Sequence, residues 1–563
     1  MVKKHLIVPI LVILILSISR TSSFCQDITL GLLSINTSKT FVGYTLIAPS
    51  RSPNTYLIDN YGYVVHKWYN EFVPELNTVI LDNGNLLRIC EDQDPDVLHG
   101  TGFLREYDWD GNIVWEYRNK RYGTHLHHDF KRMPNGNTLI ISQERFEYQE
   151  CIDAGRKPHL FNDVFIYSEY ILEVNPDKDI VWEWHFWDHL SADGGGIANG
   201  KPVSPDTTDP GKLNINYAPV TGADWIHINS IDYNPKLDQI ILTSSFLNEI
   251  YIIDHSICNY TETEAGIEAA KGPDGDFIYR WGNPSAFGRG TKNDKMLFGV
   301  HNAYWIPEGN PGAGNILFYN NGWTRNVQYS SVDEIYLPLN NDNSYIIQPS
   351  LTYGPDDLVW TYFSENKTDF YSSFLSGAQR LPNGNTLMCE GWTGRILEVT
   401  YEGEVVWEYI NPVTNSGPKP QGSILFSGNE LYRAYRYPKN HPAFAGKKLT
   451  LSQPLEKYNI LTSVDTDPGI PADFTLHQNY PNPFNPLTNI CFELERIENV
   501  NLVIYNSLGN EVNTITDNLL TPGTYIFTWN GTNNAGSAVS TGVYFYRLTA
   551  GNQTETKKMI FMK

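Results

Sequence analysis

Residues 105–117 read REYDWDGNIVWEY, and this pattern returns at intervals along most of the chain. Apolar and polar residues alternate on either side of an acidic or glycine turn, and the second half ends on an aromatic residue. Such alternation predicts a β-hairpin, because successive side chains of a strand face opposite sides of its sheet. Equivalent stretches end at Trp68, Trp184, Trp281, Tyr362 and Tyr409.

A second hairpin pattern is built around Asn-Gly-Asn. Asn-Gly supplies the positive φ that tight hairpin turns require. Two hairpins make a four-stranded unit, and we count six such units, which predicts an all-β chain with a six-bladed β-propeller over residues 40–450. The units are too unequal in length for a solenoid. The Asn-Gly-Asn copies lie at residues 81–86, 133–138 and 381–386, and looser ones at 233–238, 306–311 and 426–430.

Charge and cysteine content exclude several function classes. The chain of 563 residues has 41 basic and 63 acidic side chains, a net charge of −22. Binding to nucleic acid or to an anionic membrane needs a basic surface, so we expect no nucleic-acid partner. The cysteines are widely spaced, without a CxxC motif, and predict neither a redox centre nor a disulfide framework. After the first 25 residues they are Cys90, Cys151, Cys258, Cys389 and Cys491.

The first 25 residues predict a signal peptide. Lys3 and Lys4 precede an apolar run over residues 6–18, which is too short to span a bilayer and typical of a secretory signal. No later stretch is apolar enough for a transmembrane segment. We therefore expect an exported protein.

Two long inserts interrupt the repeats. Residues 185–223 are rich in Gly, Pro, Asp and Thr, and residues 254–275 carry a short Glu/Ala-rich stretch. Loops of this length are commonly functional lids or disordered excursions. We favour a lid for the first insert.

The C-terminal part has a different organisation, with a linker over 451–473 and a segment of short alternating strands over 474–563. The alternation predicts a small immunoglobulin-like β-sandwich. Residues 474–486, FTLHQNYPNPFNP, and 540–547, STGVYFYR, resemble the C-terminal sorting domain of the type IX secretion system. This resemblance implies export across the outer membrane by that machinery, to the cell surface or the medium. The predicted strands are 489–494, 501–506, 523–529, 542–548 and 557–562.

Three histidines share one position in the repeat. His128, His227 and His301 each lie seven residues before the turn of the second hairpin, where Ser376 stands in a further repeat. Equivalent strand starts of a propeller meet around its axis, so we expect the three imidazoles to converge at one mouth of the channel. The histidines without this register, most of which we expect at the surface, are His66, His99, His125, His127, His159, His185 and His189.

Histidine and arginine together suit chemistry at an anionic ester. Histidine titrates near neutral pH, so it can donate a proton or attack as a nucleophile. The guanidinium fork of arginine matches the oxygens of sulfate, phosphate or carboxylate. Three histidines can instead hold a zinc ion.

The motifs DWIHINS at 224–230, GVHNA at 299–303, NNG at 320–322 running to Arg325, and YRA at 432–434 resemble bacterial arylsulfate sulfotransferases. The resemblance spans roughly residues 40–445. It implies an enzyme that moves a sulfuryl group from a phenolic sulfate ester to a phenolic acceptor, both small molecules, without a nucleotide donor. No cofactor or metal is expected. The family's supporting histidines and arginine match His227, His301 and Arg325.

The sulfated histidine of the family has no counterpart, because residues 327–440 contain no histidine. We therefore expect His128 or His301 to act as the nucleophile, or the sulfuryl group to pass directly between two phenols. Arg325 would stabilise the sulfuryl oxygens, and His227 would protonate the departing phenolate. The substrate-binding candidates are Trp225, Asn229, Asn302, Asn321, Glu390, Arg395, Tyr432 and Arg433.

Two other functions remain open at this stage. One is a catalytically inactive propeller that binds a sulfated or phenolic ligand, or a glycan, at the cell surface. The other is a quinoprotein-like oxidoreductase, since hairpins ending in Val-Val-Trp are typical of that propeller class. The chain has no vicinal cysteine pair, and histidines rather than carboxylates occupy the shared register.

Overall fold

The chain is almost entirely β-structure. The computed structural model describes residues 29–91, 102–121, 123–220, 222–257, 275–350, 352–425, 427–456, 474–494, 497–520, 523–551 and 553–562. The predicted signal peptide, most of the linker, His99, Cys258 and most of the second insert lie outside the described residues. Within them there is one short α-helix, α1 (Tyr148–Asp153), and no helix long and apolar enough to cross a membrane.

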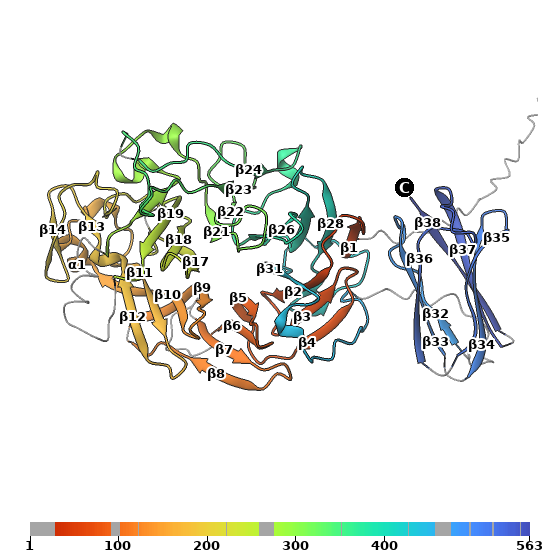
Figure 1. The fold of residues 1–563 in the computed structure, drawn as a ribbon. Coiled ribbons are helices and arrows are strands. Elements are labelled where there is room, and N and C mark those ends of the chain that lie inside the picture. The colour runs from red at the N-terminus through yellow and green to blue at the C-terminus, as the bar shows by residue number, and fades with distance from the viewer. Residues whose placement is uncertain are drawn as a thin grey trace, which may run out of the picture.

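Twenty-four of the described strands before residue 440 form six antiparallel groups of four (Figure 1). The second and third groups are joined into one sheet by the pair Gly102 and Leu126. Each repeat unit of the sequence corresponds to one group, and the Gly of each Asn-Gly-Asn turn has a positive φ, for example 90° at Gly136. The first group is β31 (Leu431–Pro438), β2 (Gly43–Pro49), β3 (Thr55–Asp59) and β4 (Val64–Trp68). The second is β5 (Pro74–Ile80), β6 (Leu86–Glu91), β7 (Gly102–Tyr107) and β8 (Ile113–Tyr117). The third is β9 (Thr124–Arg132), β10 (Thr138–Glu147), β11 (Phe165–Val174) and β12 (Ile180–His185).

The remaining three groups follow in chain order. They are β17 (Ile228–Asn234), β18 (Gln239–Ser244), β19 (Glu249–Asp254) and β20 (Tyr279–Trp281); β21 (Val300–Trp305), β22 (Ile316–Asn320), β23 (Ser331–Ile335) and β24 (Trp360–Tyr362); and β25 (Gly377–Arg380), β26 (Thr386–Glu390), β27 (Arg395–Val399) and β28 (Val405–Ile410). The N-terminal strand β1 (Gly31–Ile35) pairs with the outer edge of β28.

The groups are arranged like the blades of a propeller. The first strand of each group contacts the first strand of the next, from β5 through β9, β17, β21 and β25 to β31, and β31 contacts β5. The late strand β31 pairs with the early strand β2, so the first group draws on both ends of this region. Buried apolar residues of successive groups pack together between the sheets. Burial of this apolar surface stabilises the arrangement.

The first insert is not a strand-free lid. It contains the short strands β13 (Leu190–Ser191), β14 (Gly196–Ala198), β15 (Lys201–Val203) and β16 (Leu213–Asn214). Its side chains Trp187 and Leu213 are each 1% exposed and belong to the core cluster between the third and fourth groups. The lid prediction is therefore wrong, because the insert is held in place by its own buried apolar residues.

The C-terminal part consists of two sheets, β32 (Phe474–Leu476), β33 (Thr488–Leu494) and β36 (Gly523–Trp529), and β35 (Glu511–Leu520), β34 (Glu498–Asn506), β37 (Gly542–Ala550) and β38 (Gln553–Phe561). Ile490 and Tyr546 are fully buried in a core of its own. Tyr480 reaches the propeller-like part, where its hydroxyl hydrogen-bonds the backbone of Leu32.

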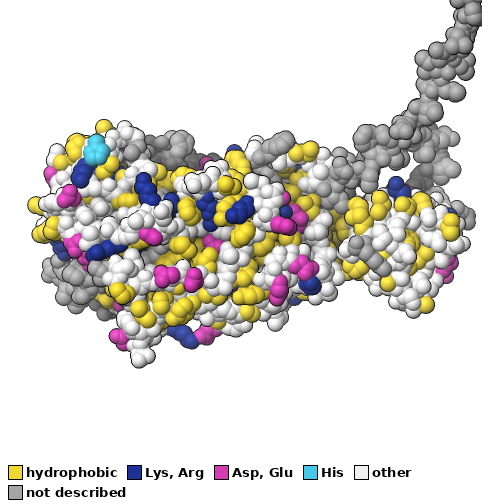
Figure 2. Space-filling model, turned by 90° about the horizontal axis from the view of Figure 1, so that it is seen from above, with side chains coloured by type: hydrophobic (Ala, Val, Ile, Leu, Met, Phe, Trp, Pro, Cys, Tyr) yellow, Lys and Arg dark blue, Asp and Glu magenta, His cyan; other side chains and the backbone are white. Residues whose placement is uncertain are grey.

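The surface agrees with the charge of the chain. On the face in Figure 2, acidic and basic side chains are interspersed among apolar and neutral ones.

Candidate active site

The site lies where the inner strands of neighbouring groups begin. His128, His227 and Asn302 have φ values of 57°, 55° and 55°, and Ser376 has 85°. A non-glycine residue at positive φ breaks the regular alternation of side chains along a strand. His128 and His227 thus share one backbone feature. In the fifth group that feature falls on Asn302, one residue after His301.

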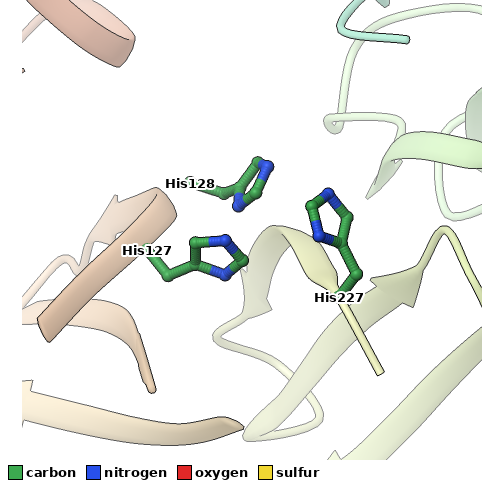
Figure 3. A group of neighbouring side chains, drawn as sticks. All are labelled: His127, His128 and His227. Atoms are coloured by element: carbon green, nitrogen blue, oxygen red, sulfur yellow. The ribbon is translucent and has the colours of Figure 1, made fainter. Parts of the chain in front are cut away.

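Three imidazoles lie together at this position (Figure 3). The ring centres of His128 and His227 are 4.5 Å apart, and that of His127 lies 3.8 Å from His128 and 5.3 Å from His227. His125 and His127 are each 9% exposed, so the expectation that they lie at the surface is wrong. One ring nitrogen of each of His127, His128 and His227 lies within 4.8 Å of the others, a ligand set suited to a metal ion.

His227 is oriented by a carboxylate that the sequence reasoning did not select. Its Nδ1 lies 2.5 Å from Asp224 Oδ2, and Gln143 Nε2 donates to Asp224 Oδ1 at 3.3 Å. Burial by itself would raise the pKa of Asp224, but the charge and hydrogen bond of His227 outweigh it and hold this pKa below its usual value. The pair therefore favours an imidazole that donates from Nδ1 and leaves Nε2 free.

A buried polar chain supports this pair. His125 Nε2 lies 2.7 Å from Gln143 Oε1, and Gln143 Nε2 also donates to Glu169 Oε1 at 3.0 Å. Burial, with a further contribution from the charge of Asp224, raises the pKa of Glu169 to about 8. Glu169 is therefore protonated at neutral pH. Glu169 stands in none of the motifs, so the sequence does not indicate it as a site residue. Asp224, in contrast, is the first residue of the DWIHINS motif.

His301 has a defined tautomer. Its Nδ1 lies 2.7 Å from Asn321 Oδ1, while Asn321 Nδ2 donates to the backbone oxygens of Ser372 and Leu375 at 2.8 and 3.1 Å. Two carbonyl acceptors fix the orientation of the amide, so His301 Nδ1 must carry the proton. Its Nε2 consequently holds a lone pair.

Burial holds His127, His128 and His301 neutral. Burial lowers the pKa of His301 to about 3, and the charges of His227 and Arg433 act in the same direction. Burial also lowers the pKa values of His127 and His128 well below 6.5, and for His128 the charges of His127, His227 and His301 add to the effect. His301 stands on β21, which contacts β17, the strand that begins directly after His227. A neutral imidazole can act as a nucleophile or as a metal ligand.

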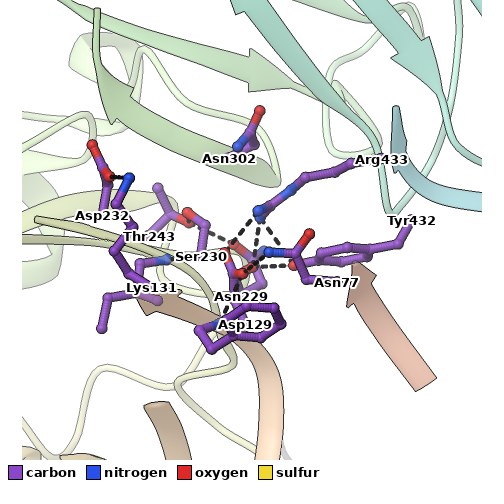
Figure 4. Close-up of polar contacts among 12 residues, drawn as sticks. Asn77, Asp129, Lys131, Asn229, Ser230, Asp232, Thr243, Asn302, Tyr432 and Arg433 are labelled. Carbon is purple, nitrogen blue, oxygen red and sulfur yellow. Dashed lines mark hydrogen bonds and ion pairs between the residues drawn. The ribbon is translucent and has the colours of Figure 1, made fainter. Parts of the chain in front are cut away.

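The charge of Arg433 lowers the pKa values of His128 and His301. Figure 4 shows this arginine among polar contacts with Asp129, Asn229 and Tyr432. Its Nη1 forms an ion pair with Asp129 Oδ2 at 2.7 Å, and its Nη2 donates to Tyr432 Oη at 3.0 Å and to the Asn229 backbone oxygen at 3.3 Å. Tyr432 Oη donates to the same oxygen at 2.5 Å. These contacts join β31 to β9 and β17, so Arg433 and Tyr432 hold inner strands together as well as giving the site positive potential.

The recorded contacts of Arg325 are with groups other than the histidines. Its guanidinium donates to the Tyr329 backbone oxygen at 2.7 Å and to Ser331 Oγ at 2.9 Å, and it stacks 4.1 Å from the Tyr329 ring centre. No contact joins it to His128, His227 or His301 among the described residues. The structure therefore does not bring Arg325 together with the registered histidines.

The other residues that the sequence predicts to contact substrate lie either in the core or between inner strands. Trp225 is fully buried in the core, beneath Arg156 at 5.0 Å, so it offers no face to a substrate ring. The prediction that it binds substrate is wrong. Asn302 Oδ1 accepts from the Ala378 backbone nitrogen at 2.8 Å, and Asn229 Nδ2 donates to the Val300 backbone oxygen at 2.9 Å. Both amides thus link neighbouring inner strands.

Glu390 and Arg395 belong to a different cavity. They form an ion pair at 3.0 Å and line a cavity of about 430 Å³ with Thr368, Asp369 and Tyr371. Burial raises the pKa of Glu390 to about 7, against the opposing charge of Arg395. None of the three central histidines lines this cavity.

Comparison with known proteins identifies families for two parts of the chain. The model of the family described as "Arylsulfotransferase (ASST)" matches residues 32–433, and that of the "FlgD Ig-like domain" matches residues 489–554. No curated protein matches the chain.

Solved structures give only distant similarities. A protein of unknown function from Bacteroides caccae is 13% identical, with 66% of this chain and 93% of that chain covered and a TM-score of 0.35. A putative 6-phosphogluconolactonase from Bacteroides fragilis is 9% identical, with 71% and 99% covered and a TM-score of 0.34. At these TM-scores the likenesses carry no argument about function.

Proposed function

The chain belongs to the arylsulfotransferase family, and on this basis we propose that it is an exported aryl sulfotransferase. It moves a sulfuryl group from a phenolic sulfate ester to a phenolic acceptor without a nucleotide sulfate donor. We further propose that the six sheets close into a six-bladed propeller and that residues 474–563 act as a type IX sorting domain. The ring of contacts among the inner strands supports the first of these, and the FTLHQNYPNPFNP motif supports the second.

The observation that carries the proposal is the fixed tautomer of His301. Its Nδ1 is bound to Asn321 at 2.7 Å, which leaves Nε2 with a lone pair. A nucleophilic histidine needs such a nitrogen, and a low pKa keeps it unprotonated at neutral pH. His301 therefore takes the role for which residues 327–440 offer no histidine.

The transfer runs in two balanced steps. In the first, His301 Nε2 attacks the sulfur, the S–N bond forms, and the S–O bond to the donor phenol breaks with its electron pair on the phenolate oxygen. In the second, the oxygen of the acceptor phenol attacks the same sulfur and the S–N bond breaks, which returns the lone pair to Nε2. The acceptor's proton ends on the donor phenolate, so a phenol and a new sulfate ester leave.

Two charges need compensation during these steps. The positive potential of Arg433, which already acts on His128 and His301, attracts the anionic sulfuryl oxygens. The departing phenolate faces His227, whose Nδ1 is held by Asp224 at 2.5 Å and whose Nε2 is free. That nitrogen can neutralise the phenolate directly through a proton or through a cation that it binds.

The test uses the purified mature chain with 4-nitrophenyl sulfate and an excess of a second phenol. Release of 4-nitrophenol is followed by absorbance, and the sulfated acceptor by mass spectrometry. We expect acceptor-dependent turnover that falls by at least about 100-fold in His301→Ala and in His227→Ala. The exposed His159 provides the matched control, and His159→Ala should keep full activity.

Two results would contradict the proposal. Sulfated acceptor formed at the normal rate by His301→Ala would exclude His301 as the nucleophile. If the wild type shows no turnover but aryl sulfates raise its melting temperature, the protein binds these esters without catalysing transfer.

A further inference from the structure

Two neighbouring histidines and a third from the next sheet face one small space (Figure 3). In a regular strand His127 and His128 would point to opposite sides, but the φ of 57° at His128 lets both rings meet His227. The rings stand edge to face, with interplanar angles of 89°, 84° and 76°. Such angles direct ring edges, which carry the nitrogens, toward the shared space.

The hydrogen bonding of these rings is incomplete. Among the described residues no hydrogen bond reaches the imidazole of His127 or His128, and the Nδ1 atom of each is buried. A buried polar nitrogen without a partner destabilises the protein. His227 donates from Nδ1 to Asp224 and keeps Nε2 free. Each ring thus retains at least one nitrogen without a hydrogen-bond partner, and the contact of His127 Nδ1 with Glu169 Oε1, at 3.9 Å, is too long for a hydrogen bond.

We infer that His127, His128 and His227 together bind one zinc ion. Zinc binds imidazole nitrogens at about 2.0–2.1 Å with tetrahedral geometry, which corresponds to nitrogens about 3.4 Å apart. The present nitrogens lie within 4.8 Å of one another, so small ring rotations bring them to this spacing. Three imidazoles without a thiolate suit zinc, and also cobalt, nickel and copper.

The surroundings support zinc at an open site rather than a closed structural one. A zinc-bound histidine commonly donates its second nitrogen to a carboxylate, and His227 does so to Asp224. Asp224 is in turn held by Gln143 at 3.3 Å. Three protein ligands leave the fourth tetrahedral position for a substrate oxygen or water, as in catalytic zinc sites.

The part that the ion plays rests on the proposed function. When the S–O bond of the donor breaks, its electron pair stays on the phenolate oxygen, and a zinc ion held by these three histidines would supply the positive charge that this oxygen needs. The S–N bond to His301 forms as before, and the ion keeps its oxidation state. The phenolate then needs no proton from His227 at this step.

The experiment measures binding of the metal itself. The mature chain is stripped with a chelator and titrated with Zn²⁺ by calorimetry, and with Co²⁺ by visible absorption. We expect one zinc per chain with a Kd below about 1 µM, and the intense visible bands of tetrahedral cobalt. His127→Ala should weaken zinc binding by at least about 100-fold, whereas the exposed-surface control His159→Ala should leave it unchanged.

The outcomes separate the metal site from the proposed reaction. Absence of stoichiometric zinc binding and of tetrahedral cobalt bands in the wild type would overturn the inference, whether or not the variants fold. An unchanged affinity in a folded His127→Ala would overturn the ligand assignment. Zinc binding without sulfuryl transfer would support the metal site and contradict the proposed sulfotransferase activity. Full transfer by zinc-free protein would support the function and exclude a part for the ion in it.

Discussion

At the scale of single residues, the contact between Asn321 and His301 leads to a prediction about the pH dependence of sulfuryl transfer. Asn321→Asp places a carboxylate where the amide oxygen now lies 2.7 Å from His301 Nδ1. An adjacent negative charge favours the imidazolium, so the pKa of His301 should rise from about 3 by about 1–3 units. The rate of sulfuryl transfer by the variant should therefore decrease when the pH is lowered below about 6, whereas the wild type remains active at that pH.

The measurement is the kcat/KM profile from pH 4.5 to 8, together with an NMR titration of the imidazole nitrogens. Asn340→Asp, which introduces a carboxylate at an exposed turn, is the control. An unshifted His301 titration in Asn321→Asp would show that the amide does not set the state of this ring.

The sequence led to part of the site but not to its geometry. The repeat register led to His128 and His227, which share a positive φ, because equivalent strand starts of a repeat have equivalent backbones. It could not find His127, since strand alternation predicts that a neighbour of His128 points away. The motifs led to both Arg325 and Arg433, but not to the ion pair of Arg433 with Asp129, which joins distant parts of the chain.

At the scale of elements, an ion pair between strands β10 and β12 predicts a loss of stability at alkaline pH. His185 Nδ1 lies 2.7 Å from Glu144 Oε1. Burial alone would lower the pKa of His185, but Glu144 and Glu183 outweigh it and raise this pKa to about 10. Stability from a raised histidine pKa is complete below about pH 6.5 and is lost as the pH rises through 10. We expect a loss of about 2 kcal/mol between pH 7 and 10, allowing for solvent screening.

NMR titration of His185 and thermal unfolding at pH 7 and pH 10 test this. Glu144→Gln should lower the His185 pKa and reduce the difference in melting temperature between the two pH values. Titration of His185 near pH 6.5 in the wild type would contradict the prediction.

Secondary structure was predictable where local pattern decides it. The Asn-Gly-Asn hairpins and the aromatic strand ends correspond to observed strands, because turn chemistry and alternation are local properties. The insert at 185–223 was misread, since its strands β13 to β16 have only two or three residues and show no period. Its order comes from buried side chains such as Trp187, and contacts between distant residues leave no spacing signal.

At the scale of the whole molecule, the ion pair of Arg433 with Asp129 ties the last inner strand to the third group. Both side chains are buried, at 7% and 0% exposed. Removing one partner leaves an uncompensated charge, which costs about 3–5 kcal/mol. Asp129→Asn should therefore destabilise the protein strongly, while the double variant Asp129→Leu, Arg433→Met should recover part of the loss. Guanidinium unfolding of the three proteins measures this, and equal stability of the single variant and wild type would contradict it.

Tyr480 links the C-terminal sandwich to the sheet that carries both β1 and β28. Its hydroxyl donates to the Leu32 backbone oxygen at 2.9 Å and accepts from the Leu32 nitrogen at 2.8 Å, and its ring packs in the core cluster of that sheet. Tyr480→Phe keeps the ring but leaves two buried backbone groups unpaired, a loss of about 1–3 kcal/mol. We expect amide exchange at Leu32 to accelerate by at least about 5-fold.

Tyr544→Phe is the matched control, because that hydroxyl bonds only within the C-terminal part, to the Ser540 backbone oxygen at 2.7 Å. It should leave exchange at Leu32 unchanged. Acceleration in Tyr480→Phe alone would mean that the sandwich secures the strand β1 at the outer edge of the sixth sheet. Since β1 and β28 come from opposite ends of this region, the C-terminal sandwich would then stabilise the propeller-like part. Equal exchange rates in both variants would mean that the two parts fold and open independently.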